Sequence, residues 1–140
     1  MKILVAVYGS RFTKRMLAYL AAHDEWLGAH HDYTLLTVVS PMPGRATAVI
    51  AKEVLKAYYE EEGAKVFKPI RAFLARQGIE ANYVSRVGQP AELIVRQATS
   101  GRYDLLMMGS HGHGNLSGLV MGSVTAKVLA HCKTPMLLVR

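Results

Sequence analysis

Residues 105–112, Leu105-Leu106-Met107-Met108-Gly109-Ser110-His111-Gly112, join an apolar segment directly to a glycine-rich loop. The apolar residues at 105–108 predict a short strand that is buried on both faces, as in a parallel sheet. From Gly109 to Ser123 the loop holds five glycines and no Asp, Glu, Lys or Arg. A strand that ends in such a loop is typical of α/β proteins, in which ligands bind beyond the carboxyl ends of parallel strands.

Similar apolar segments recur along the chain, and helical patterns separate them. We expect strands at residues 2–7, 33–39, 79–87, 105–108 and 135–139, the third of them nearer the sheet edge. Expected helices cover 16–27, 47–77, 90–98 and 122–131, and Gly63 and Pro69 are the expected places for a bend or break in the long one. Because strands and helices alternate, we predict a single doubly wound α/β domain over residues 1–140, a parallel sheet with helices on both faces.

The composition bounds the class of protein. The chain has 140 residues, of which 51% are hydrophobic and 19% charged, as in a globular domain. No apolar stretch approaches the roughly 20 residues of a membrane span, no signal-peptide pattern follows Met1, and Cys132 is the only cysteine. We therefore expect a soluble cytoplasmic protein. The net charge is +7, but Lys and Arg are dispersed without a run of five like charges, so no nucleic-acid partner is expected.

The glycine-rich loop suits a phosphate group. Glycines let consecutive N–H groups approach an anion, and a helix that begins near Gly122-Ser123 directs its positive end into the same space. A flexible surface loop that uses glycine only for turns would have the same composition. A Walker A loop is excluded because Asn115 follows Gly114. A dinucleotide-binding fingerprint is excluded because that motif, G-x-G-x-x-G, follows the first strand, whereas this loop follows the fourth and has a different glycine spacing.

The spacing that this loop does match is G-x-x-G, nine residues, then G-S, filled by Gly109, Gly112, Gly122 and Ser123. It resembles the ATP-binding signature of the universal stress protein (UspA-like) family. The similarity covers the whole chain, including the first strand with Gly9-Ser10, the turn Gly88-Gln89-Pro90-Ala91 and the closing segment Thr134-Pro135-Met136-Leu137-Leu138-Val139. The resemblance implies a five-stranded, Rossmann-like sheet in the order 3-2-1-4-5, which places the ends of the first and fourth strands side by side.

The resemblance also implies a set of site residues and ligands. Phosphates would contact Gly109, Gly112, Gly122, Ser123 and the Val124 amide, while Tyr8, Gly9, Val38 and Met108 would lie near adenine and ribose. The implied cofactors are ATP and, with it, Mg²⁺. One position departs from the family, because an acidic residue usually stands where this chain has Tyr8. Tyrosine removes a carboxylate that could face ribose or a cation, and it could fill part of the pocket or stack on a base.

Three functions remain open at this stage. The first is a regulatory nucleotide-binding homodimer of the stress response, paired through the closing strand, which would otherwise be an exposed apolar edge. The second is a slow ATPase, although no general base, Arg finger or carboxylate pair is evident, so no catalytic residue is assigned. The third is a nucleotide-free dimeric interaction protein with a pocket closed by Tyr8. No metal site is expected, since His111 and His113 have no Cys or carboxylate beside them.

Overall fold

The computed structural model describes residues 1–8, 11–111 and 121–140. The described strands form one parallel sheet of five strands in the order β3-β2-β1-β4-β5, which confirms the predicted topology. These strands are β1 (Lys2–Ala6), β2 (Asp32–Val39), β3 (Ala81–Val87), β4 (Leu105–Gly109) and β5 (Met136–Val139). The helices between them are α1 (Arg11–Ala22), α2 (Asp24–Leu27), α3 (Gly44–Thr47), α4 (Lys52–Arg76), α5 (Pro90–Ser100) and α6 (Ser123–His131).

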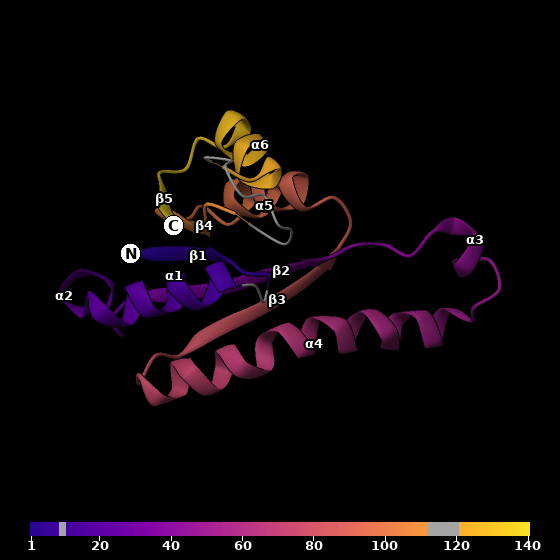
Figure 1. Cartoon of the computed structure of the whole chain (residues 1–140), viewed down its shortest axis with the longest axis horizontal. Coiled ribbons are helices and arrows are strands. Elements are labelled where there is room, and N and C mark those ends of the chain that lie inside the picture. The colour runs from indigo at the N-terminus through magenta and orange to yellow at the C-terminus, as the bar shows by residue number, and fades with distance from the viewer. Residues whose placement is uncertain (9–10, 112–120) are drawn as a thin grey trace.

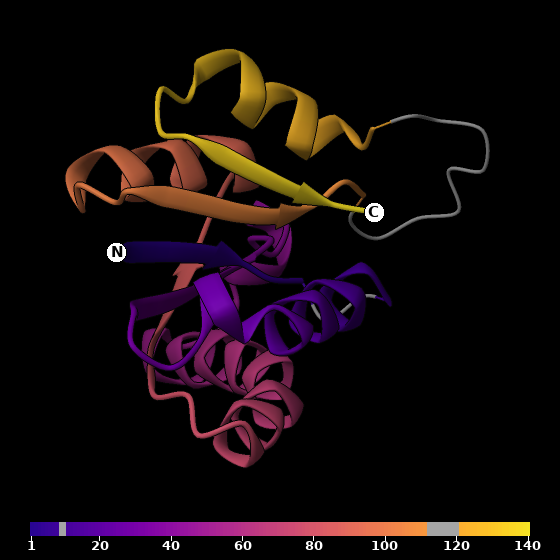
Figure 2. The same cartoon turned by 90° about the vertical axis from the view of Figure 1, so that its left-hand side faces the viewer.

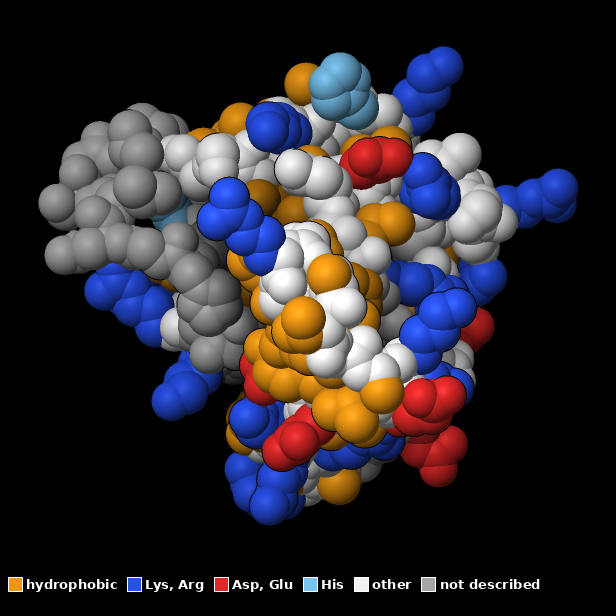
Figure 3. All heavy atoms as spheres, turned by 90° about the vertical axis from the view of Figure 1, so that its right-hand side faces the viewer, with side chains coloured by type: hydrophobic (Ala, Val, Ile, Leu, Met, Phe, Trp, Pro, Cys, Tyr) orange, Lys and Arg blue, Asp and Glu red, His pale blue; other side chains and the backbone are white. Residues whose placement is uncertain are grey.

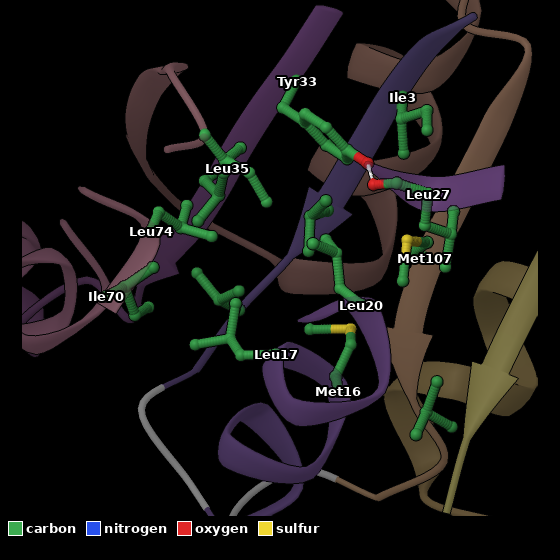
Figure 4. Packing of buried hydrophobic residues seen from close by; sticks show 14 of the residues in the cluster. Ile3, Met16, Leu17, Leu20, Leu27, Tyr33, Leu35, Ile70, Leu74 and Met107 are labelled. Carbon is green, nitrogen blue, oxygen red and sulfur yellow. Dashed lines mark hydrogen bonds between the residues drawn. The ribbon is translucent and has the colours of Figure 1, made fainter. Parts of the chain in front are cut away.

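Helices cover both faces of the sheet, as Figures 1 and 2 show. Helices α1 and α4 lie on one face and α5 and α6 on the other, because alternate residues of each strand point to opposite sides. On β1, Ile3 and Val5 pack towards α1 and α4, whereas Leu4 and Ala6 pack towards α5 and α6. Figure 4 shows the first of these clusters, in which the Tyr33 hydroxyl points to the Leu27 carbonyl oxygen and donates a hydrogen bond to it.

The long helix differs from the prediction. Helix α4 runs without interruption through both Gly63 and Pro69, and the chain instead leaves helical structure between α3 and α4, at residues 48–51. Proline in a helix interior removes an N–H donor, but Phe67 and Ile70 on either side of Pro69 are buried against the sheet. This packing holds the helix continuous, so the predicted break was wrong.

Helix α4 ends by a specific hydrogen-bond pattern that also corrects a strand boundary. Gly78 adopts a φ of +68°, the Gly78 N–H donates to the Ala75 carbonyl at 3.1 Å, and the Ile79 N–H donates to Leu74 at 2.9 Å. This is the Schellman arrangement, which suits glycine because of the positive φ. Ile79 is therefore part of the helix ending, and β3 begins at Ala81 and not at the predicted residue 79.

Helix α3 and the first half of α4 project beyond the carboxyl ends of the strands (Figure 1). Figure 3 views the molecule from this side, where hydrophobic side chains gather between charged ones; the large exposed hydrophobic residues of α4, its preceding segment and the end of β3 are Val49, Val54, Tyr58 and Val87. Within the described ranges, no helix has the length and apolar character needed to cross a membrane.

Candidate functional site

A cavity of about 350 Å³ lies at the carboxyl ends of β1 and β2. It is lined by the ends of these strands and by α4, α5 and α6, so both helical layers contribute to it. The volume falls within the range of small-molecule sites, which begin at about 300 Å³. Its lining residues are Tyr8, Thr37, Val38, Val39, Ser40, Glu62, Val66, Pro90, Ser123, Val124 and Thr125.

The first turn of α6 forms one wall of this cavity. Gly122 is the N-cap residue and has no side chain to accept from the helix, and the first intrahelical bond runs from the Ala126 N–H to the Gly122 carbonyl at 3.0 Å. The N–H groups of Ser123, Val124 and Thr125 precede that bond and have no intrahelical acceptor. Together with the positive end of the helix dipole, such groups favour an anion.

Two hydrogen bonds fix this helix start to the end of β4. The Thr125 hydroxyl, on a buried side chain, donates to the Gly109 carbonyl oxygen at 3.1 Å, and the Gly122 N–H donates to the Ser110 carbonyl oxygen at 2.8 Å. An ideal Cβ at Gly109 would lie 2.9 Å from Cβ of Phe12, so only glycine fits there without a shift of α1. The α6 donors are therefore held in place before any ligand arrives.

Tyr8 follows β1, which is the central strand of the sheet, and its side chain lines the cavity. Its N–H donates to the Thr13 hydroxyl at 3.2 Å, which ties the end of β1 to the first turn of α1. Burial raises the pKa of the Tyr8 phenol well above its ordinary value. The group is neutral at physiological pH, so this position presents an aromatic surface where the resemblance implies a negative charge.

A carboxylate nevertheless lines the cavity, from an element that the sequence did not implicate. Glu62 on α4 forms part of the wall, and its Oε1 accepts a hydrogen bond from Lys65 Nζ at 3.0 Å. This ion pair raises the pKa of the Lys65 ammonium. Gly63, the next residue, could have indicated the location, because a glycine inside a long helix is often kept where the helix approaches another backbone closely.

The structure brings together Tyr8, Val38, Ser123 and Val124 of the predicted site residues, and all four line the cavity. Gly109 and Gly122 do not line the cavity, but their carbonyl oxygens accept hydrogen bonds from Thr125 and Ala126 of α6. Met108 does not line the cavity, because its side chain is fully buried between the sheet and α5 and α6. Gly9 and Gly112 lie outside the described residues.

Among the described residues, His111 and Cys132 both pack against neighbouring side chains. His111 Nδ1 lies 2.9 Å from the Ser110 hydroxyl, and its ring packs 4.9 Å from the ring of Phe12, measured between centroids. Cys132 is a partly buried thiol at the end of α6, packed among apolar residues. His113 lies outside the described residues, and among the residues that the structure describes no three His, Cys, Asp or Glu side chains form a group that could hold a metal ion.

Comparison with known proteins places this architecture in a family. The sequence model of the universal stress protein family matches residues 1–140, the full length of the chain. The chain belongs to the universal stress protein family. A Thermus aquaticus universal stress protein, named for the 3′ region of QAH/OAS sulfhydrylase, is 31% identical over 140 residues, covering 99% of this chain and 97% of the relative. The predicted membership of this family is thereby confirmed.

Solved structures of universal stress proteins share the fold. The hypothetical protein MJ0577 of Methanocaldococcus jannaschii superposes with a TM-score of 0.80 at 27% identity, covering 99% of this chain and 94% of that one. An Arabidopsis thaliana member with AMP bound gives 0.70 at 16%, covering 99% and 90%. An Archaeoglobus fulgidus member in complex with dAMP gives 0.61 at 20%, covering 100% and 98%. The Arabidopsis and Archaeoglobus proteins are only 16% and 20% identical to this chain, so their similarity shows the fold alone.

Proposed function

We propose that this chain is a cytoplasmic regulatory protein of the stress response that binds an adenine nucleotide, ATP being the expected ligand, in the cavity at the carboxyl ends of β1 and β2. One observation carries the proposal. The first turn of α6, which has no side-chain cap, opens into a cavity whose other walls are strand ends, apolar side chains of α4 and α5, and the Glu62 carboxylate, so an anionic group and a flat base could be bound together. The AMP-bound and dAMP-bound members of the family support this assignment.

The phosphate group would lie at α6. Ser123 supplies a hydroxyl besides its N–H, and the N–H groups of Val124 and Thr125 complete a set of donors on one turn. The described residues at this end include no carboxylate and therefore form no Mg²⁺ site by themselves; a Mg²⁺ that accompanies ATP would be coordinated by phosphates and water. We derive no hydrolytic step, because the described lining offers no Arg or Lys for the transferred group.

A charge introduced at Ser123 tests the phosphate site and separates binding from folding. Ser123→Asp places a negative charge at the start of α6, where it favours the helix dipole by about 0.3–1 kcal/mol. The same charge repels a phosphate, so we expect unchanged or higher thermal stability together with at least tenfold weaker binding of AMP and ATP in isothermal titration calorimetry.

The matched control is Ser100→Asp, which introduces the same charge at the C-terminus of a helix instead of the N-terminus. Ser100 is the last residue of α5, about 15 Å along that helix from Pro90 at the cavity. Its carboxylate opposes the helix dipole, so stability should fall slightly while binding stays at the wild-type level. If Ser123→Asp binds AMP as tightly as the wild type, or if the wild type binds neither nucleotide at millimolar concentration, the proposal is wrong.

We further propose that the protein is a homodimer paired through β5. Strand β5 forms one edge of the sheet, and its sequence, Met136-Leu137-Leu138-Val139, is wholly apolar. An edge strand of this kind pairs readily with a second copy about a two-fold axis. Analytical ultracentrifugation should give twice the 15.4 kDa mass of one chain; a monomer at micromolar concentration would contradict this.

A further inference from the structure

We infer that Glu62 selects the base of the bound nucleotide, its carboxylate accepting a hydrogen bond from an exocyclic amino group. The inference rests on the proposed nucleotide site and adds to it a residue that determines specificity. The cavity has two polar ends of opposite character: N–H donors at the start of α6 and a carboxylate acceptor on α4. Helices α4 and α6 lie on opposite faces of the sheet (Figures 1 and 2), so the two polar ends reach the cavity from opposite sides of the strands.

Close packing of α4 against the sheet holds Glu62 at this place. Gly63 is buried, and a Cβ built on it would lie 2.4 Å from Oγ and 2.9 Å from Cβ of Ser85 on β3. The absence of a side chain at Gly63 therefore lets the helix backbone rest directly on β3. One and two turns further along α4, Phe67 and Ile70 are buried in the core. Glu62 is thus carried by a fixed helix and not by a loop.

The carboxylate remains available to a ligand. Its partner, Lys65, has a side chain that is 63% exposed, and the side chain of Glu62 is 34% exposed. An ion pair of this exposure contributes little to stability, so giving it up costs little. Lys65 binds Oε1, and a carboxylate has about four acceptor positions over its two oxygens. A second donor can therefore bind Glu62 while the ion pair persists.

The position of Glu62 indicates which part of a nucleotide it meets. Its negative charge repels phosphates, which are drawn to the donors of α6. A nucleotide with its phosphate at α6 would extend past Tyr8 at the end of β1 towards the end of β2, where Val38 and Val66 offer apolar surface for a flat ring. Glu62 and Val66 are four residues apart on one face of α4. A base against Val66 therefore presents its edge to Glu62.

The chemistry of that edge distinguishes the bases. An amino group, as at position 6 of adenine, donates to a carboxylate, and a hydrogen bond to a charged group discriminates more strongly than one between neutral groups. A nucleotide whose base is unsubstituted purine lacks the amino group and so loses this hydrogen bond, but it keeps the ring system, the ribose and the phosphate. AMP and purine riboside 5′-monophosphate are therefore a matched pair of probes for Glu62.

The experiment compares calorimetric affinities of these two nucleotides for the wild type and for Glu62→Ala, Glu62→Gln and Glu61→Ala. Glu61 is an exposed neighbour on α4 that does not line the cavity, so its variant is the charge-matched control. We expect the wild type and Glu61→Ala to prefer AMP by about tenfold or more. Glu62→Ala should bind both equally, and Glu62→Gln, which keeps a neutral acceptor oxygen, should show an intermediate preference.

The outcomes separate this inference from the proposed function. If all variants bind AMP and Glu62→Ala keeps the wild-type preference, or if the wild type binds the two nucleotides equally, Glu62 does not select the base, while the nucleotide site stands. If the wild type binds neither nucleotide, the site itself is wrong and the inference fails with it. Circular dichroism of each variant confirms that the change in preference occurs in folded protein.

Discussion

Replacing Gly63 with alanine should destabilise the protein, although the same substitution stabilises most helices. In a helix interior, alanine is about 1 kcal/mol more favourable than glycine. At this position, however, the new Cβ would lie 2.4 Å from Ser85 Oγ and 2.9 Å from Ser85 Cβ. The hydroxyl can rotate away, but the Ser85 Cβ is attached to the backbone of β3 and cannot, so α4 or the strand must shift.

The expected magnitude follows from these two opposing effects. Overpacking a filled site costs about 1–3 kcal/mol, which outweighs the gain in helix propensity by about 0–2 kcal/mol. A loss of 1 kcal/mol corresponds to a decrease in Tm of about 4 °C for a chain of this length. Because a shift of α4 also moves Glu62, the affinity for AMP should fall in the same variant.

Thermal and urea unfolding of a double-mutant cycle provides the assay. Ser85→Gly removes both close atoms, so the Gly63→Ala/Ser85→Gly protein should be more stable than the sum of the two single effects implies. Gly44→Ala is the control, because a Cβ there would meet nothing within 4 Å. A Gly63→Ala protein that melts above the wild type, or a cycle whose effects are additive, would refute the close-packing argument.

Three further predictions concern the core and the cavity wall. Tyr33→Phe should cost about 1–3 kcal/mol, because the buried Leu27 carbonyl that the hydroxyl binds is left without this donor. Burial raises the pKa of Tyr33 from 10.0 to about 12, so the native state favours the neutral phenol. This contribution to stability is complete below pH 10 and is lost as the pH rises through 12. It should therefore be absent from the alkaline unfolding curve of Tyr33→Phe. Thr125→Val should cost about 1 kcal/mol in urea unfolding and weaken AMP binding, because the Gly109 carbonyl no longer holds the start of α6; full stability and affinity would show that the bond is dispensable. Tyr8→Asp should strengthen ATP binding in calorimetric titration by restoring an acidic residue at the end of β1, whereas equal or weaker binding would show that the aromatic side chain serves the ligand better.

Local sequence patterns predicted the sheet well because each strand is buried in a characteristic way. The continuous apolar segments of β1 and β4 are buried on both faces, and the less regular β3 lies at the edge. The predicted ends of the strands were less accurate where specific backbone hydrogen bonds determine them. Ile79 looks like a strand residue, but its N–H completes the hydrogen-bond pattern that ends α4.

The candidate site was predictable only in part, for a different reason. Ser123 and Val124 belong to a glycine-rich spacing that stands out in the sequence, Tyr8 follows the recognisable strand β1, and Val38 lies at the end of the equally recognisable strand β2. Glu62 has no such motif around it and reaches the cavity only because α4 packs on β3. Gly63 and Pro69 predict a bend or break because their local cost is visible in the sequence, whereas the packing that outweighs this cost is not.

The measurement that tests the central claim most directly is a titration of ¹⁵N-labelled protein with AMP, followed by amide chemical shifts. The account predicts saturable shifts at Ser123, Val124 and Thr125, where the phosphate would bind, and at Val38 at the end of β2. Amides at the opposite ends of the strands, such as Tyr33, should not move. Shifts confined to another surface, or none at millimolar AMP, would contradict the assignment of this cavity as the nucleotide site.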